Sequence, residues 1–198
     1  MVNRWEISKW VNNLRSLDIT AQKISVNALG LIAKGGGAKE IVKEKGVNPL
    51  VQCMFHKNSD IRSKAILTIS NIAKGGWSKE VVEEKGITPL VRNLSDNDAN
   101  VRANAAAALA YIAKGGWSKE VAEEKGIAPL VRNLSDNDAN VRVCAASVLA
   151  YILKDGLNKE VVEANGIAPL IYPIAKDLYV CVQHRHWPTL LKVDEVKR

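Results

Sequence analysis

The 198-residue chain has few aromatic residues, few cysteines and few histidines. It contains one Phe, and aromatic residues make up only 5% of it, which argues against a packed β core and against aromatic platforms that stack on bases. The three cysteines, Cys53, Cys144 and Cys181, are odd in number and irregularly spaced. They predict no disulfide framework and favour a reducing compartment.

Long apolar runs are also lacking. The first ten residues, MVNRWEISKW, contain no apolar stretch of the kind that forms the core of a signal peptide. The longest apolar run, at 143–153, is too short to cross a bilayer. We therefore expect a soluble protein without a membrane partner, located in the cytoplasm, with the nucleus as a second possibility.

Residues that carry enzymatic chemistry are sparse. Cys181, His184 and His186 lie close together, but no second ligand pair accompanies them, so they do not predict a zinc site. No Gly-rich phosphate loop has the required Lys-Ser or Lys-Thr, and no serine, histidine and acid form a nucleophilic motif. The prediction is a protein that is not an enzyme and has no cofactor and no metal.

What the sequence does contain is one 40-residue unit written several times. The dozen residues SNIAKGGWSKEV at 70–81 return at 110–121 as AYIAKGGWSKEV, changed only at the first two positions. Four units occupy 6–45, 46–85, 86–125 and 126–165, and a degenerate copy at 166–198 is expected to cap the end. The near identity of the copies is compatible with recent duplication and with a consensus-like design.

Each unit predicts three helices. A short one starts near Ser118, which we expect to be its N-cap, and a medium one carries Pro129 in its first turn. The long one, 100–114, places apolar residues on one face and ends at a Gly-Gly pair; these residues are Val101, Ala105, Leu109 and Ile112. No segment alternates like a strand. The chain therefore predicts an all-α, right-handed α-solenoid that forms a single domain over 1–198.

The unit resembles the armadillo repeat, and the related HEAT repeat less closely. The resemblance is carried by G-I-x-P-L-V, then A-A-x-A-L-x-x-I-A, then K-E-V, which match in register over residues 6 to about 175. It implies that the long helices line a concave groove, where a family Asn holds the backbone of an extended peptide. Only Asn71 occupies that position here, and Leu31, Tyr111 and Tyr151 replace it elsewhere. The companion Trp of the family is replaced by Asn27, Leu67, Ala107 and Ser147.

A lysine recurs at the end of every long helix, which favours an acidic ligand. The main hypothesis is a non-enzymatic scaffold that binds an extended, acidic protein segment in the groove. The alternatives are a nucleic-acid-binding solenoid, supported by the net charge of +7, and a structural or self-associating module. We expect a monomer or weak self-association. The predicted peptide-binding residues are Asn71, Tyr111, Tyr151, Lys34, Lys74, Lys114, Lys154, Asn100, Asn104 and Asn140.

Several of these columns also have a purely structural interpretation. A lysine at a helix C-terminus suits the helix dipole without any ligand, and Tyr111 and Tyr151 could pack against a neighbouring helix. Trp77 and Trp117 are interpreted as hydrophobic staples at the start of the short helices, and binding anchors are the other option. A regular arginine column predicts ion pairs with the adjacent unit, and phosphate contacts are the other option; its members are Arg62, Arg102 and Arg142.

Overall fold

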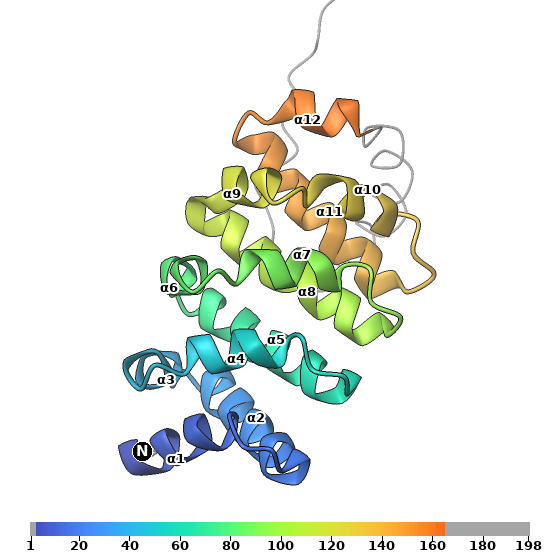
Figure 1. The fold of residues 1–198 in the computed structure, drawn as a ribbon. Helices are drawn as coiled ribbons and strands as arrows, with labels where there is room; N and C mark the ends of the chain where they lie inside the picture. The colour runs from blue at the N-terminus through green and yellow to red at the C-terminus, as the bar shows by residue number, and fades with distance from the viewer. Residues whose placement is uncertain (1–2, 165–198) are drawn as a thin grey trace, which may run out of the picture.

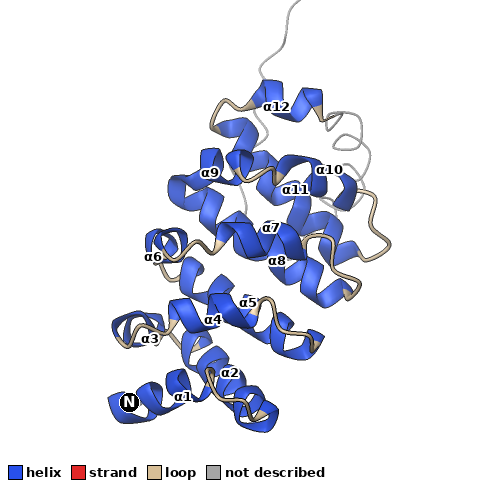
Figure 2. Cartoon of the chain, in the orientation of Figure 1, coloured by secondary structure: helices blue, strands red, loops and turns tan. Residues whose placement is uncertain are grey.

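The computed structural model describes residues 3–164, and every regular element in this range is helical (Figures 1 and 2). The proposed cap at 166–198, with Cys181, His184 and His186, lies outside the described residues. The helices are α1 Arg4–Asn13, α2 Ile19–Lys34, α3 Ala38–Lys43, α4 Val47–Cys53, α5 Ser59–Lys74, α6 Ser78–Glu83, α7 Ile87–Asn93, α8 Ala99–Ile112, η1 Ala113–Trp117, α9 Ser118–Glu123, α10 Ile127–Asn133, α11 Ala139–Lys154 and α12 Asn158–Glu163.

Three kinds of helix alternate along the chain, as the repeats predict. The long helices α2, α5, α8 and α11 are stacked in chain order, and each contacts the next (Figure 1). The medium helices α4, α7 and α10 each pack on the long helix that follows them. No unit can bury its apolar face alone, so the core runs continuously from one unit to the next.

Local sequence fixes both ends of each long helix. The side chains of Asp18, Asn58, Asp98 and Asp138 cap the four N-termini by accepting backbone N–H bonds. Past the other end, a glycine adopts φ between +86° and +93°, a conformation that costs other residues strain. These glycines are Gly36, Gly76, Gly116 and Gly156. The chain therefore turns at the same point of every unit and enters the short helix.

The expectation that Ser118 caps the short helix is wrong. Trp117 holds the N-cap position without a side-chain bond, and Ser118 is the first helical residue. Its hydroxyl is buried and donates to Asp155 Oδ2 at 2.6 Å, while Ser78 donates to the carbonyl of Tyr111 at 3.4 Å. The glycine turn places this serine against the next unit, so it joins units. The half-buried Trp117 packs on the core, in agreement with the structural role expected of it.

Candidate binding face

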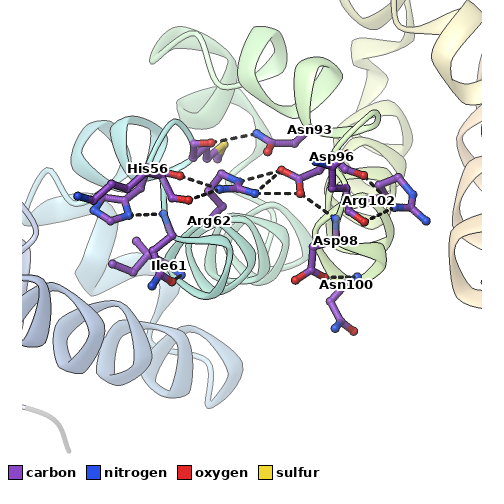
Figure 3. Close-up of polar contacts among 12 residues, drawn as sticks. His56, Ile61, Arg62, Asn93, Asp96, Asp98, Asn100 and Arg102 are labelled. Carbon is purple, nitrogen blue, oxygen red and sulfur yellow. Dashed lines mark hydrogen bonds and ion pairs between the residues drawn. The ribbon is translucent and has the colours of Figure 1, made fainter.

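Successive units are joined along one side of the stack by a set of polar contacts that we call the loop edge. It comprises the turns before the long helices and the arginine column that reaches them (Figure 3). Arg62 Nε and Nη2 donate to the Asp96 carboxylate at 2.8 and 2.9 Å, and Arg102 meets Asp136 at 2.7 and 2.9 Å. The predicted ion pairs with the adjacent unit are confirmed for these two arginines.

Each arginine also closes the turn of its own unit. Nη1 of Arg102 donates to the carbonyls of Asp96 and Asn97 at 2.8 and 3.1 Å, and Arg62 and Arg142 make the matching bonds in their own turns. The Arg102 guanidinium lowers the pKa of Asp136, and the carboxylate in turn raises the pKa of Arg102. The arginine column is therefore part of the scaffold.

Two buried asparagines strengthen the same junctions, and the sequence reasoning missed them. Asn93 Nδ2 donates to the carbonyl of Met54 at 3.1 Å, and Asn133 Nδ2 to that of Leu94 at 3.0 Å. Each satisfies a carbonyl at the end of the preceding medium helix. The available signal was an asparagine repeated at 40-residue spacing, three residues after the buried leucine of each of these two helices.

A second surface consists of side chains that point to solvent from the long helices, and we call it the long-helix face. Its positions are spaced 4, 3, 4 and 3 residues apart, which is one face of a helix, and all are exposed or half-buried. They are Thr20, Ile24, Asn27, Leu31 and Lys34 on α2; Asp60, Lys64, Leu67, Asn71 and Lys74 on α5; Asn100, Asn104, Ala107 and Tyr111 on α8, followed by Lys114 in η1; and Asn140, Cys144, Ser147, Tyr151 and Lys154 on α11.

All ten residues predicted to bind peptide lie on this face. The four lysines are exposed at the ends of the long helices. Tyr111 and Tyr151 are half-buried and pack against the core with part of each ring. Tyr111 and Tyr151 occupy equivalent positions on α8 and α11, which are in contact, and burial together with the Tyr111 hydroxyl raises the pKa of Tyr151. Asn71 is half-buried, at the equivalent position on α5.

The three other asparagines differ in what their side chains do. Asn104 Nδ2 donates to Ser63 Oγ at 3.0 Å, a bond that joins α8 to α5. Asn100 and Asn140 are exposed in the first turns of α8 and α11. Asn104 therefore has a structural role that the sequence reasoning did not foresee, whereas Asn100 and Asn140 face solvent.

The face also carries exposed aliphatic residues that were not predicted as binding residues. Ile24, Leu31 and Leu67 are 53%, 65% and 45% exposed. All three belong to α2 and α5, and among the described residues no comparably large apolar side chain is exposed on α8 or α11. The signal in the sequence was an aliphatic residue at positions that are polar or small in other units, such as Ile24 against Lys64 and Asn104.

Other chemistry in the described part of the chain is limited. Within residues 3–164, no helix has the length and apolar character needed to cross a membrane, and no three His, Cys, Asp or Glu side chains gather as metal ligands. Cys53 occupies the position of Asn93 one unit earlier, and burial raises the pKa of its thiol to about 11. A thiol with that pKa is a packing residue rather than a nucleophile.

Comparison with solved structures identifies similar architectures. An engineered protein studied by a structural genomics consortium is 33% identical; the match covers 86% of this chain and 71% of that one, with a TM-score of 0.80. A designed armadillo repeat protein is 26% identical over 83% and 73% of the two chains, with a TM-score of 0.78. Another, solved in complex with the peptide (KR)4, is 25% identical over 86% and 74%, with a TM-score of 0.81.

Sequence comparison adds one family match. The model of the family described as non-SMC mitotic condensation complex subunit 1 matches residues 38–125. No curated protein matches the chain.

Proposed function

The chain belongs to the armadillo-repeat family of α-solenoids, and from that premise we propose that it is a non-enzymatic scaffold that binds an extended acidic protein segment along the long-helix face. The observation that carries the proposal is the column of exposed lysines that runs along this face beside two tyrosines. Lys34, Lys74, Lys114 and Lys154 recur once per unit, at the spacing of the long helices.

The charge of the face supports an acidic ligand. Besides the four lysines of the column, the face contains Lys64, and its acidic residue is Asp60. Lys64 Nζ lies 3.3 Å from Asp60 Oδ1, so this pair largely cancels and the lysine column sets the charge. The (KR)4 peptide of the designed relative is basic, whereas this face attracts the opposite charge.

The tyrosines would supply contact area and hydrogen bonding. Tyr111 and Tyr151 lie on the contacting helices α8 and α11, and their rings are partly held by the core, so less side-chain freedom is lost when a ligand covers their exposed parts. A preorganised pair of this kind is suited to a peptide backbone with a side chain lying between the rings.

Nucleic acid is the second candidate, because a lysine column also attracts phosphates. The arginine column, which would have added to such a surface, is instead engaged: Arg62 and Arg102 bind aspartates of the next unit. The lysines of the column share the long-helix face with exposed aliphatic side chains, which gain nothing from phosphate contact. A peptide is therefore the favoured ligand.

The test is a selection of random displayed peptides on the full chain, followed by affinity measurement at two salt concentrations. We expect an enriched acidic motif whose binding is at least about tenfold weaker to the Lys74→Glu, Lys114→Glu variant. The matched control is Lys79→Glu with Lys119→Glu, which reverses two exposed lysines on the short helices α6 and α9.

Other outcomes would contradict the proposal. Enrichment of basic peptides, or no enrichment, would overturn it. Affinity for a random single-stranded oligonucleotide that exceeds the affinity for every selected peptide, and that falls steeply with salt, would move the assignment to nucleic acid.

Loss of binding in the Tyr111→Ala, Tyr151→Ala variant would locate the site, provided that circular dichroism shows this variant to be folded.

A further inference from the structure

We propose that the long-helix face is divided, and that its α2–α5 half is a docking site for aliphatic side chains of the acidic segment. This inference rests on the proposed function and specifies which residues the segment must carry. It starts from Ile24, Leu31 and Leu67, which are 53%, 65% and 45% exposed on helices whose other large apolar residues are mostly buried.

The three side chains lie close enough to form one patch. Ile24 and Leu31 are seven residues apart on α2, which corresponds to about 10 Å along the helix axis. Leu67 occupies on α5 the position that Asn27 occupies on α2, and the two helices are in contact. Helices packed in this way have axes about 8–10 Å apart, so Leu67 lies beside the midpoint between the other two. Three exposed aliphatic side chains at these positions offer apolar surface to one or two leucine-sized residues of a ligand.

The patch is bordered by cations. Lys34 follows Leu31 by three residues, Lys64 precedes Leu67 by three, and Lys74 follows Leu67 by seven, so all lie on the same face. An aliphatic residue flanked by Asp or Glu complements this arrangement in both respects, because the apolar side chain leaves water while the carboxylates meet lysines.

The other half of the face lacks this character. At the same positions, α8 and α11 carry Asn104, Ala107, Cys144 and Ser147 beside the tyrosine pair. The bound segment is therefore expected to place aliphatic residues over α2 and α5, and backbone and polar groups over α8 and α11.

A second copy of the chain is a poorer occupant of the patch. Face-to-face contact between two copies would bring the two lysine columns toward each other, and like charges at an interface disfavour association. An acidic segment meets no such repulsion.

The test compares selections of random displayed peptides on the full chain and on the Leu31→Ser, Leu67→Ser variant. The matched control is Leu17→Ser with Val162→Ser, which removes aliphatic residues that are 100% and 54% exposed but lie off the face. On the unmodified chain and on the control we expect peptides that combine Leu, Ile or Phe with Asp or Glu. On the variant, these peptides should bind at least about tenfold more weakly, and the preference for apolar residues should disappear.

The outcomes separate this inference from the function on which it rests. If the selected peptides are acidic but show no preference for apolar residues, or if they bind the variant as tightly as the unmodified chain, the aliphatic docking site is overturned. The proposal of a scaffold for an acidic segment is then unaffected. Failure to enrich any acidic peptide would overturn both. A mass in light scattering that rises with concentration, and that returns to the monomer value in the Leu31→Ser, Leu67→Ser variant, would assign the patch to a second copy.

Discussion

At the loop edge the second, third and fourth units are joined by the same bonds, whereas on the long-helix face no two units present the same set of side chains. Arg102 repeats the bonds of Arg62 almost atom for atom, 40 residues further along the chain. On the face, the position of Tyr111 is Leu31 in the first unit and Asn71 in the second. From the second unit to the fourth, the residues that join units are therefore the same, whereas the solvent-exposed residues of the long helices vary.

At the first junction, different residues satisfy the same buried backbone carbonyl. There, Gln22 replaces the arginine, His56 replaces the aspartate and Cys53 replaces the buried asparagine. Gln22 Nε2 donates to the carbonyl of Leu14 at 3.1 Å, which is the carbonyl equivalent to Met54 O and Leu94 O. The buried acceptor is satisfied in each of these junctions, though by different residues.

The largest effect should come from removing a loop-edge arginine. Arg102→Ala loses the two bonds to Asp136 and the two to turn carbonyls, and it leaves a carboxylate that is only 10% exposed without this partner. We expect a loss of about 3 kcal/mol in the free energy of unfolding, measured by urea denaturation. The control Lys119→Ala breaks an exposed pair with Glu123 and should cost less than about 0.5 kcal/mol. Equal losses in the two variants would refute the importance of the loop edge.

A smaller loss of stability is expected when Asn93 of the third unit is replaced by cysteine, the residue that the second unit carries at the equivalent position, Cys53. Asn93→Cys removes the bonds to the carbonyls of Met54 and Pro89. Arg62, which holds the position of Gln22 in the second unit, donates to the carbonyls of His56 and Lys57 instead. The expected cost is about 2 kcal/mol, from calorimetry or urea denaturation. If the reverse change, Cys53→Asn, destabilised the chain more than Asn93→Cys, the account of the first junction would be wrong.

The loop edge should also make stability sensitive to acid. Because Arg102 lowers the pKa of Asp136 below its ordinary value of 3.8, the folded state binds this proton less readily than the unfolded state. The contribution is complete above about pH 5 and is lost as pH falls through the lowered pKa. Asp136→Asn should cost about 1 kcal/mol at neutral pH and less as the pH approaches 3, as followed by urea denaturation across this range. A cost that is independent of pH would contradict the ion pair.

A gain is expected at a position that belongs to neither surface. Lys85 directly follows Glu84, the C-cap of the short helix α6, and has φ of +57°, and Lys45 and Lys125 have similar values in their units. Lysine adopts this left-handed conformation less readily than Asn or Gly. Lys85→Asn should therefore raise the free energy of unfolding by about 0.5 kcal/mol. The control Lys79→Asn lies inside α6 and should lower stability slightly, because Asn is a poorer helix former.

The smallest effect on stability should come from the long-helix face itself. Leu31→Ala removes a leucine side chain that is 65% exposed, so the free energy of unfolding should change by less than about 0.5 kcal/mol. Thermal unfolding of this variant beside Leu17→Ala, whose leucine is fully exposed, gives the measurement. A loss comparable to that of a buried leucine would show that Leu31 is a packing residue, and the contrast between the two surfaces would weaken.

The sequence was sufficient for the architecture because the repeat makes every local pattern visible several times. Helix order, the glycine turns and the pairing of Arg62 and Arg102 with the next unit all follow from residues 40 positions apart. Ser118 was misassigned because its role depends on how the next unit is placed, which no pattern within one unit reveals.

The exposed aliphatics were harder to identify. Helix α2 has apolar residues around much of its circumference, including Ile24, Val26, Leu29 and Leu31, so its periodicity does not show which face is buried. Which of these α2 residues are buried depends on how α5 packs against the helix. The same holds for Asn104, whose bond to Ser63 requires the two long helices to lie side by side.

The bonds between units have one further consequence, for the speed of folding. The side-chain bonds that join one unit to the next span between 33 and 41 residues of chain, whichever unit they belong to. A chain lengthened by another copy of 86–125 would gain a junction without bringing more distant residues together. Since folding slows mainly as contacts become more distant in sequence, such a chain could add units while each new junction forms as fast as the last.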